Sequence, residues 1–196
     1  MARIGFVGAG NRARVHVETL YAVRDRTYAG TDDSRPVEAR YEAHAGEIPE
    51  WVERVADLDP SVTALFDPDA DQRERTRECC REHGDDPTTF DAFEAFLDSG
   101  AFDAAAVVSP NDCHAEQVVA LLERDIDVLC EKPLADDLAG HDSIIEAAAG
   151  SSALVYPAYN LRMAPFFARL RELVAEGAVG DLGAVSCHEV RGPFKD

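Results

Sequence analysis

Lysine is scarce in this chain: only Lys132 and Lys195 stand among its 19 lysine and arginine side chains. Long apolar runs are missing as well, and no stretch approaches the ~20 residues that a membrane-spanning helix needs. The five cysteines are odd in number and lack the spacing of metal ligands, which argues against a zinc site and a disulfide framework. We therefore expect a protein of the reducing cytoplasm, with no membrane span and no metal.

The chain also has few basic residues compared with acidic ones. It contains 38 aspartates and glutamates and 19 lysines and arginines, which give a formal net charge of −19. This excess argues against nucleic acid as a partner, because the chain would repel the phosphates that it must neutralise. An acidic surface with few lysines is typical of proteins from a salt-rich cytoplasm. We interpret the charge as the mark of a halophilic setting and not of a chemical function.

What the chain does contain is a glycine-rich turn near its start. Ile4 to Val7 form a short apolar run typical of a buried strand, and helical spacing of apolar residues follows the turn. Between them lies Gly8-x-Gly10-x-x-Ala13, the dinucleotide-binding fingerprint with alanine in the third place. Gly8 permits the sharp turn, Gly10 lacks the Cβ that would hold a pyrophosphate away, and Ala13 lets the helix lie close to the strand.

The helix after this turn favours a bound phosphate. Its first-turn N–H groups and the positive end of its dipole face the phosphate oxygens. Asn11 and Arg12 lie in the turn, so both join Gly8 and Gly10 as predicted cofactor-binding residues. For Arg12, contact with phosphate and contact with solvent remain open alternatives.

Strands and helices alternate from the start of the chain to about residue 158. The predicted strand segments are 4–7, 62–66, 88–90, 102–108, 128–130 and 153–156. This alternation predicts an α/β fold, a Rossmann-like, doubly wound parallel sheet. Ligands of such sheets bind beyond the carboxyl ends of the strands.

The second strand of this sheet comes late in the sequence. Asp67 ends it, where dinucleotide folds place an acidic residue for the adenosine ribose, typically ~20 residues after the glycines. Here Asp67 stands 57 residues after Gly10, so we expect an insertion at about 24–60, with a loop at 31–36 and a short helix at 49–55. The insertion is a lid, an oligomer contact or a surface excursion without function.

The pattern changes after residue 158. An amphipathic helix is predicted at 165–176 and a strand at 184–190. We therefore divide the chain into a dinucleotide-binding domain at 1–158 and, at 159–196, the first helix and strand of a second, α+β domain.

Five motifs occur in the order and at roughly the spacing of one family. They are Gly8-Ala9-Gly10, Asp67-Pro68, Ser109-Pro110-Asn111-Asp112-Cys113-His114, Glu131-Lys132-Pro133-Leu134 and Asn160-Leu161-Arg162. On these motifs the chain resembles the Gfo/Idh/MocA oxidoreductases, named in part for glucose–fructose oxidoreductase and inositol dehydrogenase. The resemblance implies a C-terminal, mostly antiparallel sheet that forms the substrate pocket and an oligomer interface, truncated in this chain.

The resemblance also implies roles for the matching residues. Asp67 would hold the adenosine ribose, and Glu131 would contact the nicotinamide-side ribose. Lys132 would be the catalytic residue, donating to a substrate hydroxyl or carbonyl and assisting proton transfer.

The same motifs imply roles for further residues. Pro110, Asn111 and His114 would line the cofactor's path toward the nicotinamide. Arg162 would either reach a substrate oxygen or pair with an acidic neighbour. Four histidines outside these motifs are expected to be ordinary surface residues: His16, His44, His83 and His141.

The function implied is that of an NAD-dependent oxidoreductase, which transfers hydride to or from a sugar, a polyol or a similar small molecule. NAD is expected over NADP, because no arginine or serine directly follows Asp67 to receive a 2′-phosphate. The family's catalytic histidine would lie in the C-terminal sheet, so the chain is either part of a longer enzyme or a truncated product that binds cofactor without turnover. A non-catalytic dinucleotide-binding module and an NAD-dependent glycosidase are the alternatives.

Overall fold

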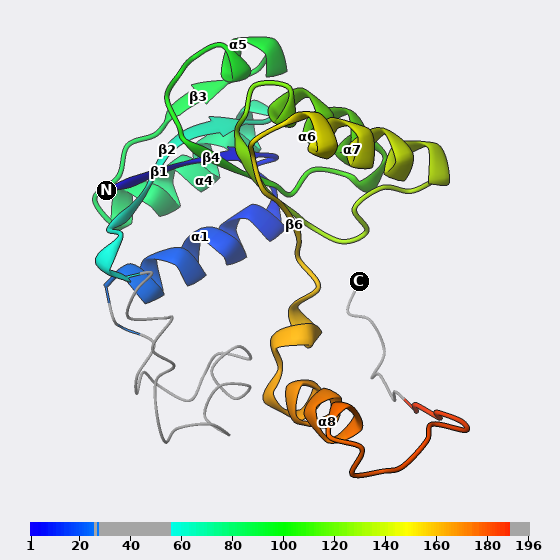
Figure 1. Ribbon diagram of the computed structural model, residues 1–196. Coiled ribbons are helices and arrows are strands. Elements are labelled where there is room, and N and C mark those ends of the chain that lie inside the picture. Colours follow the sequence, from blue (N-terminus) through cyan, green and yellow to red (C-terminus); the bar gives the residue numbers. More distant parts are fainter. Residues whose placement is uncertain (26, 28–55, 189–196) are drawn as a thin grey trace. The chain divides into compact units, whose positions relative to one another are not determined.

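The computed structural model describes residues 1–25, 27 and 56–188 (Figure 1). These residues form two compact units, unit 1 at Met1–Ala158 and unit 2 at Tyr159–Asp196. Most of the expected insertion, including its predicted loop at 31–36 and helix at 49–55, lies outside the described residues.

Unit 1 alternates strands and helices as the sequence predicts (Figure 1). Its strands are β1 (Ala2–Val7), β2 (Pro60–Phe66), β3 (Thr88–Phe90), β4 (Ala104–Val107), β5 (Asp127–Cys130) and β6 (Val155–Pro157). Its helices are α1 (Asn11–Arg24), α4 (Ala70–Glu82), α5 (Phe93–Leu97), the 3-10 turn η2 (Asn111–Cys113), α6 (His114–Leu122) and α7 (Leu138–Gly150).

All the paired strands run parallel in one six-stranded sheet of order β3-β2-β1-β4-β5-β6. The predicted Rossmann-like, doubly wound fold is therefore confirmed. The order reverses between β1 and β4, which is the place where such sheets bind ligands. Because the strands are parallel, their carboxyl ends share one edge: Val7 stands opposite Phe66 of β2 and Val107 of β4.

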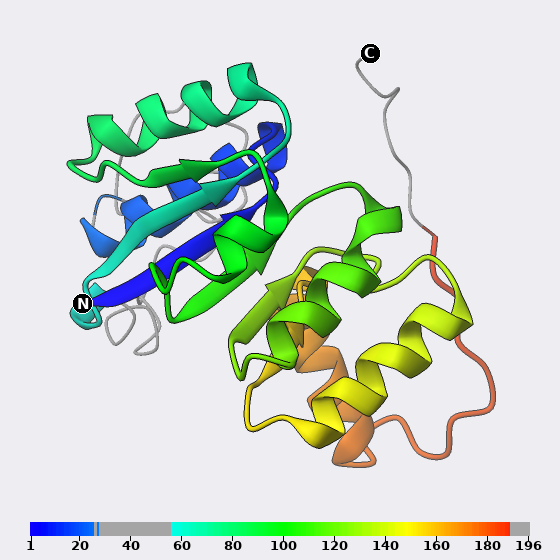
Figure 2. The same ribbon diagram turned by 90° about the horizontal axis from the view of Figure 1, so that it is seen from above.

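Helices cover the sheet on both faces. On one face α5, α6 and α7 pack over a cluster that includes Val7, Phe96 and Leu121, with α6 and α7 side by side (Figure 2). On the other face α1 and α4 pack over a cluster that includes Phe6 and Leu65. Strands covered on both faces have the continuous apolar character that identifies them in the sequence.

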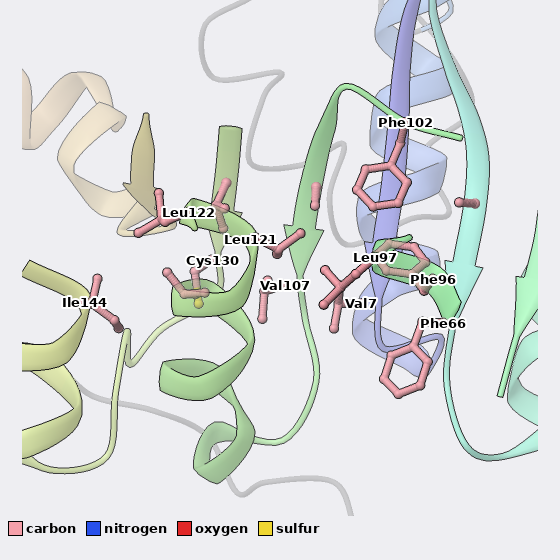
Figure 3. Packing of buried hydrophobic residues seen from close by; sticks show 14 of the residues in the cluster. Val7, Phe66, Phe96, Leu97, Phe102, Val107, Leu121, Leu122, Cys130 and Ile144 are labelled. Carbon is pink, nitrogen blue, oxygen red and sulfur yellow. The ribbon is translucent and has the colours of Figure 1, made fainter. Parts of the chain in front are cut away.

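Aromatic rings fill the first cluster beside β1. Figure 3 shows the ring of Phe96 between those of Phe102 and Phe66, at centroid distances of 4.3 Å and 6.3 Å. Gly5 of β1 makes room for them, since a Cβ there would come within 2.7 Å of the Phe102 ring and 2.8 Å of the Phe96 ring.

A polar network holds the end of α1 at the opposite edge of the sheet. The buried Tyr21 hydroxyl donates to Asp85 at 2.7 Å, and Arg24 lies 3.3 Å from the same carboxylate. Burial and this hydrogen bond raise the pKa of Tyr21. His83 stacks on the Tyr21 ring at 4.6 Å, so His83 is part of a packed network and not the ordinary surface residue that the sequence suggested.

The sheet face beside α1 also carries an open apolar groove. It has a volume of about 440 Å³, and its lining includes Phe6, Leu20, Leu129 and Tyr156. Across the stretches that the structure describes, no helix combines the length and apolarity needed to cross a membrane.

Unit 2 contains the 3-10 turn η3 (Asn160–Met163) and helix α8 (Pro165–Ala175). The predicted helix at 165–176 is confirmed, with proline in its first turn. The predicted strand at 184–190 is wrong for its described part, because residues 184–188 have no regular structure. A strand needs the hydrogen bonds of a neighbour, and unit 2 has no other strand among its described residues.

Candidate functional site

The glycine turn joins β1 to α1 at the carboxyl edge of the sheet. Gly8 has φ +95°, in the left-handed region, and a Cβ there would lie 2.8 Å from the backbone nitrogen of Ser109. A Cβ on Gly10 would meet no atom within 4 Å. Gly10 is also the N-cap of α1 and has no side chain to accept from the first-turn N–H groups. The turn therefore leaves open space and available donors, which fits a pyrophosphate.

Asp67 lies directly beside this turn. Its Oδ2 accepts from the N–H of Ala9 at 2.8 Å, and its Oδ1 accepts from the N–H of Asp69 at 2.9 Å. Asp69 in turn caps α4 by accepting from the N–H groups of Asp71 and Gln72. The contact with Ala9 joins the end of β2 to the glycine turn, across 58 residues of sequence.

Arg73 also lies beside Asp67, and it was not among the site residues predicted from the sequence. Its Nη1 donates to the carbonyl oxygen of Asp67 at 2.5 Å. Arg73 does not directly follow Asp67 in the sequence but reaches back to it from α4. The helical spacing of Asp69 and Arg73, four residues apart, was the available signal.

Glu131, at the end of β5, is held by three groups. His16 Nε2 lies 2.9 Å from Oε1, Arg12 Nε lies 3.3 Å from the same oxygen, and the N–H of Lys132 donates to Oε2 at 3.1 Å. The Glu131 side chain is only 12% exposed. Burial by itself raises the pKa of this carboxyl, but the hydrogen bonds from His16 and Lys132 N–H and the charge of Arg12 outweigh it, so the pKa is lowered.

This cluster bears on two expectations about α1. Arg12 lies 3.3 Å from the Glu131 carboxylate, and its side chain is 54% exposed to solvent. His16 is not an ordinary surface residue, because it hydrogen bonds to Glu131 from 115 positions away. One helical turn separates Arg12 from His16, so the two side chains lie on one face of α1 and reach the same carboxylate.

Lys132, Pro110 and Asn111 are exposed to solvent. The Lys132 side chain is exposed and, among the described residues, has no hydrogen-bond or ion-pair partner. Pro110 is the N-cap of η2, Asn111 is its first residue, and both are exposed. All three follow the carboxyl ends of β4 and β5, where ligands of this fold bind.

His114 differs from what its motif implies. It is fully buried, with Nδ1 2.7 Å from the carbonyl oxygen of Pro133 and Nε2 2.9 Å from that of Ser109. Both ring nitrogens face backbone oxygens, which leaves neither for a cofactor. His114 therefore connects the segments that follow β4 and β5 through its contacts with their backbone oxygens. Because it is fully buried, it is not exposed at the site.

The structure thus brings Gly8, Gly10, Asn11, Arg12, Asp67 and Glu131 together at one edge of unit 1. Arg162 belongs to unit 2, which is described by itself. Across the described residues, no group of three or more His, Cys, Asp and Glu side chains could hold a metal ion.

Comparison with known proteins bears on this geometry. The model of the Gfo/Idh/MocA family, described as an oxidoreductase family with an NAD-binding Rossmann fold, matches residues 2–159. The chain belongs to this family. Because the match spans the glycine turn, Asp67 and the Glu131-Lys132-Pro133 segment, the site described above lies within the Gfo/Idh/MocA NAD-binding domain.

Individual Gfo/Idh/MocA proteins are similar over varying lengths. The myo-inositol 2-dehydrogenase of Thermotoga maritima is 25% identical over 178 residues, which are 91% of this chain and 42% of that relative. The D-xylose 1-dehydrogenase (NADP(+)) 2 of Haloferax volcanii is 33% identical over 99 residues, or 50% of this chain and 29% of the relative.

A solved structure shows the shared fold. Myo-inositol dehydrogenase from Lactobacillus casei, in complex with NAD(H) and myo-inositol, superposes with a TM-score of 0.68 at 20% identity. The superposition covers 92% of this chain and 43% of that one. This chain therefore spans less than half the length of these relatives.

Proposed function

We propose that this chain is the cofactor-binding part of an NAD-dependent oxidoreductase that acts on a sugar, a polyol or a similar small molecule. The observation that carries the proposal is the open glycine turn beside Asp67 and Glu131 at the switch point of the sheet. The similarity to inositol and xylose dehydrogenases supports the substrate class. We further propose a cytoplasmic, halophilic setting and a homo-oligomer completed by the C-terminal sheet.

The residues of the site suit the parts of a dinucleotide. The N–H groups at the start of α1, including those of Asn11 and Arg12, would hold the pyrophosphate beside Gly10. Asp67 would accept hydrogen bonds from the adenosine ribose hydroxyls, and Glu131 would accept from the ribose next to the nicotinamide. The nicotinamide ring, when bound, supplies a hydride acceptor or donor.

The exposed groups at the ends of β4 and β5 would act on the substrate side. Lys132 would donate a hydrogen bond to the substrate oxygen at the reacting carbon and assist the transfer of its proton. Pro110 and Asn111 would line the cofactor's path toward the nicotinamide. The buried His114 would hold together the segments that follow β4 and β5. Arg162 would contact a substrate oxygen, since its side chain has no acidic partner among the described residues.

We propose NAD as the preferred cofactor, although NADP-dependent relatives exist. With the adenosine ribose held at Asp67, the carboxylates of Asp67 and Asp69 would face a 2′-phosphate and would repel its charge. Two arginines near Asp67 would favour the phosphate, but both are engaged: Arg73 donates to the Asp67 carbonyl, and Arg14 donates to the carbonyl oxygen of Ala9 and to Gln72.

A glycine substitution tests the cofactor site. Gly10→Ala should fold normally, because its Cβ meets no atom within 4 Å and Gly10 has φ −76°. The added methyl group would stand where the pyrophosphate must approach, so NAD affinity measured by calorimetry should fall at least about 10-fold, roughly 1.4 kcal/mol. Gly150→Ala is the matched control, since its Cβ also meets nothing within 4 Å but lies at the end of α7.

Two results would contradict this assignment. One is an NAD affinity that Gly10→Ala leaves equal to that of Gly150→Ala. The other is the absence of NAD binding in the unmodified chain. Thermal melting of both variants shows whether each is folded.

A further inference from the structure

Thr76 of α4 is a fully buried polar side chain that contacts the glycine turn. Its exposed fraction is 0%, and its hydroxyl donates to the carbonyl oxygen of Ala9 at 2.7 Å, across 67 positions of sequence. A buried hydroxyl needs a hydrogen-bond partner, and here that partner is a backbone atom between Gly8 and Gly10. α4 is therefore joined to the turn by one specific polar contact.

Arg14 of α1 takes part in the same contact. Its Nη1 lies 3.3 Å from the Ala9 carbonyl oxygen, 3.4 Å from the Thr76 hydroxyl and 3.1 Å from Gln72 Oε1. A chain of hydrogen bonds that begins at a cation polarises its members, which strengthens the bond that the hydroxyl donates. The N–H of Ala9 is held as well, because it donates to Asp67 at 2.8 Å. Side chains therefore fix both backbone polar groups of Ala9.

The direction of the Ala9 carbonyl determines the direction of the next N–H group. This carbonyl belongs to the Ala9–Gly10 peptide bond, which is trans. In a planar trans peptide the C=O and the N–H point in opposite directions. Because the Ala9 oxygen is directed toward the buried Thr76 hydroxyl, the Gly10 N–H is directed away from Thr76.

The Gly10 N–H is available to a ligand. Among the residues that the structure describes, it donates to no acceptor. A Cβ on Gly10 would meet no atom within 4 Å, so the space around this residue is open. A free N–H group at the N-terminus of a helix is a donor for an anion such as a pyrophosphate.

We propose that Thr76 is a positioning residue for the cofactor, whose hydroxyl holds the Ala9–Gly10 peptide so that the Gly10 N–H faces the pyrophosphate. The inference rests on the proposed function and adds to the site a residue that lies in none of its sequence motifs. Thr76 is buried and acts through the Ala9 carbonyl, without touching the cofactor. Donors that are oriented before binding lower the cost of ordering the turn around the phosphates.

Thr76→Val tests the role of the hydroxyl, because valine keeps the branched shape of threonine. Calorimetric titration below the melting temperature of each variant should show NAD affinity about 10-fold lower, since the Ala9 oxygen loses its nearest donor and the peptide can turn. Thr76→Ser keeps the hydroxyl and should restore the affinity. Thr63→Val is the matched control and should leave NAD affinity unchanged: the Thr63 hydroxyl also donates to a backbone oxygen, that of Ile4 at 3.4 Å, but within β2.

A second measurement requires no cofactor. The residual dipolar coupling of the Gly10 N–H, measured by nitrogen-15 NMR, reports the direction of that bond. The coupling should change in Thr76→Val and should match that of the unmodified chain in Thr76→Ser and Thr63→Val.

Three results would overturn the proposal: a Gly10 coupling that Thr76→Val leaves unchanged, NAD binding that is equally tight in Thr76→Val and Thr63→Val, or a loss in Thr76→Ser as large as in Thr76→Val. Each of these contradicts the role of Thr76 while the unmodified chain still binds NAD. Absent NAD binding in the unmodified chain contradicts the proposed function itself.

Discussion

Glu131 shows how one carboxylate can organise a site at the scale of single residues. His16 and Arg12 reach it from α1, and the N–H of Lys132 reaches it from its own loop. The three groups fix the carboxylate beside the glycine turn and keep it ionised. Positioned acceptors of this kind lower the cost of ordering the site when a ligand binds.

The pKa of Glu131 tests this arrangement directly. Because the folded-state pKa is lowered, the ion cluster stabilises the fold above the unfolded-state pKa of about 4.3 and loses this effect as the pH falls through the folded-state value. His16→Ala should raise the Glu131 pKa, as burial then meets less opposition. Carbon-13 NMR titration of the Glu131 carboxyl measures both values.

Val15→Ala provides the control for this titration, because Val15 is an exposed neighbour on α1. The Glu131 pKa should not move in that variant. A Glu131 pKa that is the same in His16→Ala and in the unmodified chain would show that the hydrogen bond from His16 does not hold the carboxylate.

The groups around Asp67, Arg73 among them, give a test of the cofactor preference at the same scale. We expect tighter binding of NAD than of NADP at matched high salt, because the carboxylates near Asp67 oppose the 2′-phosphate. Arg73→Gln should weaken NADP binding about 10-fold and leave NAD binding nearly unchanged. Arg75→Gln is the control on the same helix, and tighter binding of NADP than of NAD by the unmodified chain would refute the preference.

At the scale of elements, β1 packs closely against the aromatic rings of the core. A Cβ on Gly5 would come within 2.7 Å of the Phe102 ring and 2.8 Å of the Phe96 ring, and both rings are fixed in the core. Gly5→Ala should therefore destabilise the fold by about 1–3 kcal/mol through overpacking. Denaturant unfolding measures the loss, with Gly150→Ala as the variant that should show none of it; equal stability of the two would contradict the packing described for β1.

At the scale of the whole molecule, net charge dominates the expected response to solvent. A net charge of −19 should destabilise the folded chain when screening is weak. We expect the melting temperature to climb from dilute buffer to molar KCl. Sucrose at equal osmolality, which is excluded from the surface but does not screen charge, should raise it less; a flat or falling curve in KCl would remove the halophilic interpretation.

Local patterns were sufficient to predict much of unit 1. β3 begins and ends where the sequence placed it, because apolar runs and turn residues act over a few positions. Gly8 could be assigned to a sharp turn for the same reason, and the structure shows that its φ is +95°. The strand expected at 184–190 is absent from its described part, 184–188, because a strand is stabilised by a neighbouring strand, which local composition does not supply.

The sequence by itself determined the alternation of strands and helices, the glycine turn and the acidic charge of this protein. Only the tertiary structure decided which side chains meet: Asp67 with Ala9, His16 with Glu131, and His114 with two backbone carbonyls. These contacts join residues up to 115 positions apart. Their geometry depends on the order of the strands and on the face that each helix covers, and no pattern within a few residues encodes either one.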